Sequence, residues 1–267
     1  MPKYLNLAVG AVAALAFVVG GCSSDGDPSS DTSSTATTAP TVTGTVTVSA
    51  AASLTEAFTT IKDDFVDANP GATVTINFGS SGQLATQITE GAPADVAAFA
   101  DQAPMTTLDG AGLLAAPAQV FARNRLVIVT KPGNPKGITS LADLATVGTV
   151  SLCTETAPCG KFADQVLQQA GVTVPAGSIT RGPDVKATLT AVTEGDAEAG
   201  IVYVTDADAA GDKVGTVEIA EADNVVAAYP IAVIRATKNQ SAAEAFRDYV
   251  LGPEAQGVLK DAGFLAP

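Results

Sequence analysis

The stretch Val46-Thr-Val-Ser-Ala-Ala-Ala-Ser53-Leu-Thr-Glu56-Ala-Phe58 changes its hydrophobic pattern halfway along. Its first half alternates apolar with small polar residues, which is typical of a β-strand. After Ser53 the apolar residues recur at the spacing of one helix face, which predicts a helix over 54–68. Ser53 and Glu56 have the spacing of a capping box, so Ser53 is predicted to be the N-cap of this helix. The chain is therefore expected to pass from strand to helix through a turn of very small residues.

Such a turn exposes backbone N–H groups, and the helix dipole adds positive potential, so it can bind an anion. The same kind of junction recurs along the chain. It is expected at Ala52-Ser53, Gly79-Ser80-Ser81-Gly82, Pro158-Cys159-Gly160 and Asp184-Val185. Ordinary helix capping explains any one of them. Several junctions that converge at the carboxyl ends of strands would instead form a cage of N–H and O–H donors around a small anion.

Strand and helix patterns alternate to the end of the chain, which predicts an α/β fold that begins near Thr45. Strands are predicted at 46–51, 73–78, 96–100, 125–130, 148–152, 200–204 and 225–234. Helices are predicted at 54–68 and 242–250, and shorter ones around Leu84, within 101–116, at 141–144, around Phe162, from Asp184 and after Pro253.

Composition limits the function classes. The chain has 267 residues, no histidine, and a formal net charge of −14. The absence of histidine excludes Ser-His-Asp and Cys-His catalysis and the usual zinc sites. The acidic charge argues against a nucleic-acid partner, which needs clustered Lys and Arg. With no phosphate-binding loop or paired-carboxylate motif either, the chain is predicted not to be an enzyme and to need no cofactor or protein-bound metal ion. A serine nucleophile with a lysine base stays formally open.

The N-terminus has the pattern of an export signal over residues 1–22, with Lys3 before a short apolar run. Its end, Val19-Gly20-Gly21-Cys22, resembles the lipobox of bacterial lipoproteins, in which the Cys is acylated; an ordinary signal peptide is the alternative. Residues 23–44 are rich in Ser, Thr, Asp and Pro and are predicted to be a disordered tether. The folded body is thus expected at the outer face of the cell membrane, anchored through lipidated Cys22.

Six motifs follow one another from about residue 45 to the end of the chain. They are Val48-x-Ala-Ala-Ala-Ser53-Leu, Phe78-Gly-Ser-Ser-Gly-Gln-Leu84, Gly91-Ala-Pro-Ala-Asp95-Val, Gly200-Ile-Val-Tyr203-x-x-Asp206-Ala, Tyr229-Pro-Ile-Ala-Val233, and Gly252-Pro-Glu-Ala255 with Gly263-Phe264. In these motifs and in their order, the chain resembles the molybdate-binding proteins of ABC transporters.

The resemblance implies a type II periplasmic binding fold, in which two α/β lobes joined by a two-segment hinge close over an oxyanion. Lobe 1 is expected at 45–122 plus 229–267, and lobe 2 at 123–228. The crossover segments would lie near 123–126 and 226–230. The implied ligand is molybdate, and also tungstate, delivered by a monomer to the membrane permease of an ABC importer.

The ligand contacts of the family carry over to five positions. Ser53, Ser81 and Tyr203 would offer hydroxyls, and Cys159 and Val185 would offer backbone N–H groups. The alternatives are simple N-caps for the two serines and a half-buried strand aromatic for Tyr203. The same fold binding sulfate or another tetrahedral oxyanion is the alternative function, and an adhesive surface protein is a third.

Position 159 departs from the family, where a small Ala is expected. In an exported chain Cys153 and Cys159 are predicted to pair as a short-loop disulfide, with two free thiols as the alternative. Asp184 is predicted to be an N-cap. Lys161 and Lys186 lie next to the junctions but are predicted to point to solvent, so neutral donors would hold the anion.

Overall fold

The computed structural model describes residues 42–267. The predicted signal peptide, the Cys22 lipidation site and nearly all of the tether lie outside the described residues. Strands and α-helices alternate, as predicted. The strands are β1 (Thr43–Ala51), β2 (Gly71–Gly79), β3 (Val96–Ala98), β4 (Gln119–Thr130), β5 (Val150–Cys153), β6 (Ile179–Gly182), β7 (Ala199–Tyr203), β8 (Gly215–Glu218) and β9 (Val226–Val233). The α-helices are α1 (Thr55–Ala68), α2 (Ser81–Thr89), α3 (Gln102–Gly110), α4 (Pro158–Gln169), α5 (Val185–Thr193), α6 (Val204–Ala210), α7 (Gln240–Leu251) and α8 (Pro253–Asp261).

Three elements escape prediction from sequence: β6, β8 and α6. β6 and β8 have four residues each, all half-buried or exposed, so neither contains an apolar run. α6 has seven residues, too few to show a helical period, and it begins at Val204, which the pattern assigns to a strand. The predicted strand at 96–100 ends at Ala98, and the predicted strand at 125–130 is the second part of the longer β4.

The strand order is β2-β1-β3-β9-β4-β7-β5-β6, and β8 pairs with β4. β1 runs parallel to β2 and β3, and β5 runs parallel to β6 and β7. β4 pairs in antiparallel fashion with β7, β8 and β9, and β9 does so with β3 and β4. The sheet therefore contains two parallel regions with an antiparallel pair between them.

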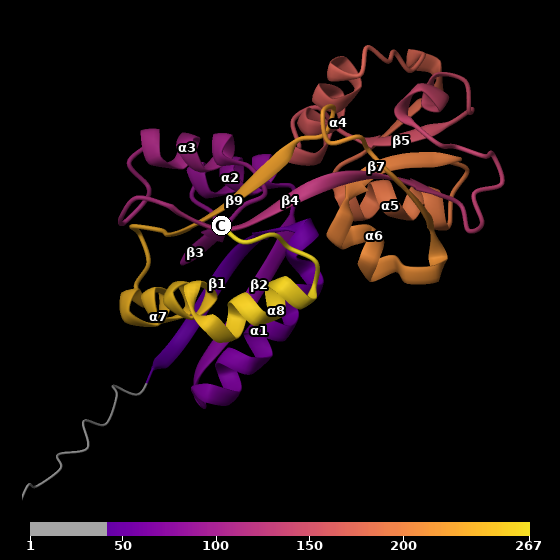
Figure 1. Ribbon diagram of the computed structural model, residues 1–267. Coiled ribbons are helices and arrows are strands. Elements are labelled where there is room, and N and C mark those ends of the chain that lie inside the picture. Colours follow the sequence, from indigo (N-terminus) through magenta and orange to yellow (C-terminus); the bar gives the residue numbers. More distant parts are fainter. Residues whose placement is uncertain (1–41) are drawn as a thin grey trace, which may run out of the picture. The chain divides into compact units, whose positions relative to one another are not determined.

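β4 belongs to both regions. Its first part, 119–125, pairs with β9, whereas its second part, 126–130, pairs with β7 and β8. We call β1, β2, β3 and β9 the first strand group, and β5, β6, β7 and β8 the second strand group. Figure 1 shows β4 and β9 side by side where the two groups meet. These two strands are the connection between the groups within the sheet.

Helices cover both faces of the first strand group. Val96 and Val233, paired across β3 and β9, belong to the large core that also contains residues of α1, α7 and α8. Their sequence neighbours Ala97 and Ala232 point to the opposite face and belong to a second core with α2 and α3. Figure 1 shows these two sets of helices on opposite sides of the strands. A ligand can then reach the sheet at the carboxyl ends of the parallel strands, where the strand-to-helix junctions lie.

The described helices are short, and the longest, α1, has 14 residues. Within residues 42–267 no helix combines the length and the apolar character that crossing a bilayer requires. Nor does this part of the chain bring three or more Cys, Asp or Glu side chains together as a cluster that could hold a metal ion.

Candidate functional site

Ser53 does not cap α1, so the predicted capping box is wrong. A 3-10 turn, Ala52–Leu54, lies between β1 and α1, and Ser53 is its middle residue. The Ser53 hydroxyl instead lies 2.9 Å from the hydroxyl of Tyr229, and both groups are buried. Because α1 starts at Thr55, Leu54 occupies the N-cap position, and no side chain caps the helix. The alternative that Ser53 is a simple N-cap is therefore excluded.

Two serines lie at the start of α2. Ser80 is in the N-cap position, but its side chain makes no capping bond. Its Oγ is buried and has no hydrogen-bond partner within residues 42–267. Ser81 Oγ accepts the N–H of Ala100 at 3.0 Å, so its own proton is free for another acceptor. Both hydroxyls are therefore able to donate to a ligand.

The third junction contains a disulfide. Cys153 at the end of β5 is joined to Cys159 in the first turn of α4, with Cα atoms 5.7 Å apart. A Cβ on Gly160 would collide with the carbonyl oxygen of Thr154, so the loop packs directly against the helix start. No side chain caps α4, which begins with Pro158. Pro158 has no N–H, and the N–H groups of Gly160 and Lys161 both donate to Ala157 O at 3.0 Å, which leaves the N–H of Cys159 for another acceptor.

The second strand group contributes two more predicted residues. Asp184 caps α5 by accepting the N–H of Ala187 at 3.0 Å, as predicted, and Val185 follows as the first helical residue. Tyr203 ends β7, is fully buried, and its hydroxyl has no hydrogen-bond partner among the described residues. Burial raises the pKa of Tyr203 well above its usual value. Tyr203 therefore keeps its proton and remains a donor.

These junctions meet at one small cavity. It is lined by the five predicted residues Ser53, Ser81, Cys159, Val185 and Tyr203, together with Ala51, Ala52, Gly79, Ser80, Ala100, Ala157, Pro158 and Asp184. Its volume is about 10 Å³, which is room for about one water molecule. The lining comes from both strand groups, so the cavity lies between them. The structure thus brings together residues that are up to 150 positions apart in the chain, from 53 to 203.

The lining of the cavity is neutral apart from one residue, Asp184, whose carboxylate is engaged in capping α5. Hydroxyls and helix N-termini provide the remaining polar groups. Such groups bind anions through donor hydrogen bonds and the partial positive charge of the helix ends. A small oxyanion without a counter-cation fits this arrangement.

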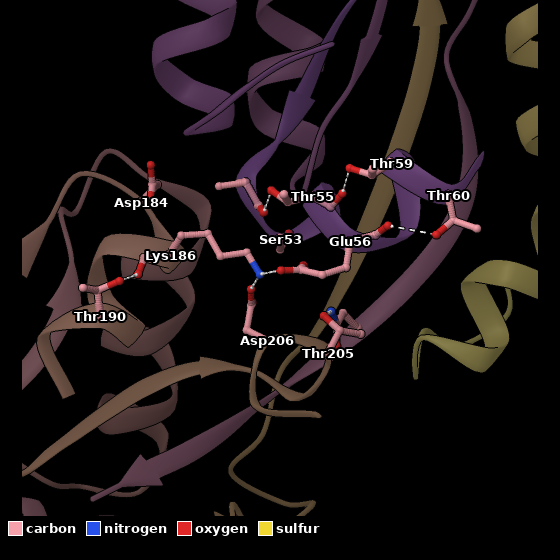
Figure 2. A network of polar contacts seen from close by, with 12 residues as sticks. Ser53, Thr55, Glu56, Thr59, Thr60, Asp184, Lys186, Thr190, Thr205 and Asp206 are labelled. Carbon is pink, nitrogen blue, oxygen red and sulfur yellow. Dashed lines mark hydrogen bonds and ion pairs between the residues drawn. The ribbon is translucent and has the colours of Figure 1, made fainter. Parts of the chain in front are cut away.

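The predicted exposure of Lys186 is wrong. Its Nζ lies 2.7 Å from a carboxylate oxygen of Glu56 on α1 and 2.9 Å from Oδ1 of Asp206 on α6, as Figure 2 shows. Lys161 also has a partner, Asp101, at 2.7 Å, although about half of its side chain is exposed. Asp206 is fully buried. A buried carboxylate needs a compensating charge, and only the tertiary structure reveals that Lys186 supplies it.

Asp206 makes the stability of the protein depend on pH. Burial raises its pKa from the ordinary 3.8 to about 6, although the Lys186 ammonium acts in the opposite direction. The folded protein therefore binds this proton more tightly than the unfolded chain. This tighter proton binding stabilises the folded protein fully below pH 4, and the stabilisation is lost as the pH rises through about 6. The free energy of unfolding thereby falls by up to about 3 kcal/mol.

We expect Asp206→Asn to flatten the decrease in stability between pH 4 and pH 7 that this carboxyl causes, because the amide does not titrate. Urea unfolding at several pH values measures the effect. Asp212→Asn, in an exposed turn, is the matched control and should keep the wild-type profile. Parallel profiles for wild type and Asp206→Asn would contradict the assignment.

Sequence reasoning missed Ser80, which lines the cavity, and four buried residues outside the lining, namely Asn124, Thr205, Asp206 and Tyr229. Asp206 and Tyr229 lie within the recognised motifs, but those motifs assign them no role. Asn124 is a buried polar residue in the middle of β4. A single amide between charged neighbours has no distinctive periodicity, so only the tertiary contacts identify it.

Comparison with known proteins identifies the family. Residues 46–265 match the bacterial extracellular solute-binding proteins. The chain belongs to this family. The match covers nearly all of the described residues, including every residue that lines the cavity. The resemblance indicated by the sequence motifs is confirmed at this level.

Relatives of this solute-binding protein are known by name and by structure. The molybdate-binding protein ModA of Mycobacterium tuberculosis H37Rv is 41% identical over 219 residues, covering 82% of this chain and 83% of the relative. The periplasmic molybdate-binding protein of Azotobacter vinelandii has a TM-score of 0.73 at 23% identity, over 83% of this chain and 99% of that one. The sulfate-binding protein SubI of M. tuberculosis has a TM-score of 0.75 at 20% identity, over 82% and 86%. At these identities the two structures show that this chain shares their periplasmic binding fold.

Proposed function

We propose that this protein captures molybdate, and also tungstate, between its two lobes and delivers it to the permease of an ABC importer. Its 41% identity to a protein named as molybdate-binding supports the choice of ligand. The observation that carries the proposal is the pair of buried hydroxyls, Ser80 Oγ and Tyr203 Oη, which line the cavity without a partner within residues 42–267. An unpaired buried hydroxyl costs free energy, and an oxyanion would supply the missing acceptor.

The proposed ligand contacts are the hydroxyls of Ser53, Ser81 and Tyr203 and the backbone N–H groups of Cys159 and Val185, with Ser80 added by the structure. Each bond from a neutral donor to a charged acceptor contributes about 1.5–3 kcal/mol net. Several such bonds in a buried site compensate for the hydration that a dianion loses. Molybdate and the smaller sulfate are alike in charge and shape, so cavity size must discriminate between them.

We assign lobe 1 to 45–122 plus 229–267, lobe 2 to 123–228, and the hinge to 123–126 and 226–230. The pairing of β4 with β9, in which Arg123 lies opposite Ala228 and Arg125 opposite Val226, supports this position. A tetrahedral oxyanion is larger than the water-sized space in the cavity. The lobes must therefore separate at the hinge to admit it.

The proposal includes the position of the protein in the cell. As a member of an extracellular family it acts outside the cytoplasm. The lipobox-like end of residues 1–22 supports a lipid anchor on Cys22, and residues 23–44 would tether a monomeric body to the outer face of the membrane.

Isothermal titration of residues 23–267 with molybdate, tungstate, sulfate and phosphate tests the ligand. We expect tight one-to-one binding of molybdate and tungstate and no heat of binding from sulfate or phosphate. Binding of sulfate or phosphate instead would keep the site and overturn the proposed ligand. No binding of any of the four anions would overturn the proposed function.

A further inference from the structure

We infer that Tyr229, held by Asn124, is a positioning residue that turns the hydroxyl proton of Ser53 into the cavity. This inference rests on the proposed function, because it concerns how the site presents a donor to an oxyanion. Tyr229 is not part of the cavity lining. Its role would be exerted entirely through Ser53.

The relevant side chains form a buried chain of polar contacts. Asn124 Nδ2 donates to Thr205 Oγ1 at 2.9 Å and has a longer contact of 3.5 Å with the Tyr229 hydroxyl. The Tyr229 hydroxyl then lies 2.9 Å from Ser53 Oγ. All four residues are buried. The chain of contacts starts at α6, crosses β4 and β9 at the proposed hinge, and ends at the turn before α1.

The direction of donation follows from Asn124. Its Oδ1 accepts the backbone N–H of Arg125 at 2.9 Å, which orients the amide with its Nδ2 towards Thr205 and Tyr229. An amide nitrogen only donates, so the Tyr229 oxygen receives at this contact. Either hydroxyl of the Ser53–Tyr229 pair can donate, and we assign the Tyr229 proton to Ser53 Oγ, its partner at 2.9 Å. With this assignment Ser53 accepts from Tyr229, and the proton of Ser53 is free for another acceptor.

Ser53 lines the cavity, and an anion bound there would be the acceptor for its proton. The position of Tyr229 is itself fixed by three edge-to-face aromatic contacts, with ring centroids 5.9 Å from Tyr203, 6.3 Å from Phe121 and 5.4 Å from Phe264. Burial also raises the pKa of Tyr229, so it keeps the proton it donates. A serine hydroxyl that would otherwise rotate is thus preorganised as a donor, which lowers the cost of binding.

A double-mutant cycle tests this inference. Tyr229→Phe removes the hydroxyl and keeps the ring, and we expect it to weaken molybdate binding about three- to tenfold in the otherwise wild-type chain. In a Ser53→Ala background the same substitution should change the affinity less than twofold, because there is no proton left to orient. In a Ser81→Ala background it should again cost about three- to tenfold.

Affinities are measured by competitive titration on residues 23–267, and urea unfolding checks the stability of each variant. Tyr249→Phe, on α7 away from the cavity, is the matched control and should bind as wild type does. Equal losses from Tyr229→Phe with and without Ser53 would show a general structural role and overturn the inference, as would no loss at all. A wild-type chain that binds no oxyanion would overturn the proposed function and this inference together, so the two failures are distinguishable.

Discussion

Replacing Ser53 and Ser81 together by alanine is expected to weaken molybdate binding by more than about a hundredfold. Each serine offers a hydroxyl to the cavity, and a hydrogen bond to a charged acceptor is worth about 1.5–3 kcal/mol. Two such losses amount to about 3–6 kcal/mol, and every 1.4 kcal/mol is a factor of about ten in affinity. The substitutions also leave the Ala100 N–H and the Tyr229 hydroxyl without their serine partners.

Titration calorimetry with molybdate measures the effect. The control is the double variant Ser178→Ala with Ser241→Ala, which removes two serines outside the cavity lining and should bind as wild type does. Urea unfolding shows whether a lower affinity comes from missing hydrogen bonds to the ligand or from a variant that is no longer folded. An unchanged affinity in a folded Ser53→Ala, Ser81→Ala protein would show that the ligand lies elsewhere.

Replacing Gly82 by alanine is expected to weaken binding more than tenfold while leaving the fold intact. Gly82 lies in the first turn of α2, and a Cβ there would be 2.5 Å from the carbonyl oxygen of Thr156 in the loop before α4. That atom is backbone and cannot rotate away. The two segments must therefore move apart, and each is next to a residue of the cavity lining, Ser81 at the start of α2 and Cys159 at the start of α4.

The stability of this variant should hold or fall. Alanine is favoured over glycine inside a helix by about 1 kcal/mol, but displacing the backbone of Thr156 costs stability in return. Gly257→Ala is the matched control, because it lies in α8 and a Cβ there would meet open space. We expect the control to hold or gain stability and to keep full affinity. Wild-type affinity in Gly82→Ala would mean that binding does not require the close approach of α2 to the loop.

The proposed site would allow a protein with a net charge of −14 to bind a dianion. The basic side chains closest to it, Lys161 and Lys186, are each paired with carboxylates. The Glu56–Lys186 pair also connects α1 to α5 (Figure 2). With the cations neutralised in this way, hydroxyls and helix ends are left to face the ligand. Neutral donors release an anion more readily than a fixed positive charge would, which suits transfer to a permease.

The sequence by itself determined the alternation of strands and helices, the small residues at each junction and the capping of α5 by Asp184. These features are local: hydrophobic period, helix stop signals and an acidic N-cap act within a few residues of one another. The five predicted contact residues were also located at junctions by local pattern and family motif. The structure places them around one cavity, but their contact with a ligand stays a prediction.

Only the tertiary structure decided which partner each polar group has. Ser53 looks like an N-cap locally, yet its hydroxyl meets Tyr229, which is 176 positions away. Lys186 looks exposed, yet it is bonded to Glu56, 130 positions away. Such contacts depend on the strand order and on how β4 and β9 join the two strand groups, and no pattern within one segment records that order. Helix caps and hydrophobic faces are local and can be predicted, whereas the direction of a buried hydroxyl and the partner of a buried charge are set by elements that meet only after folding.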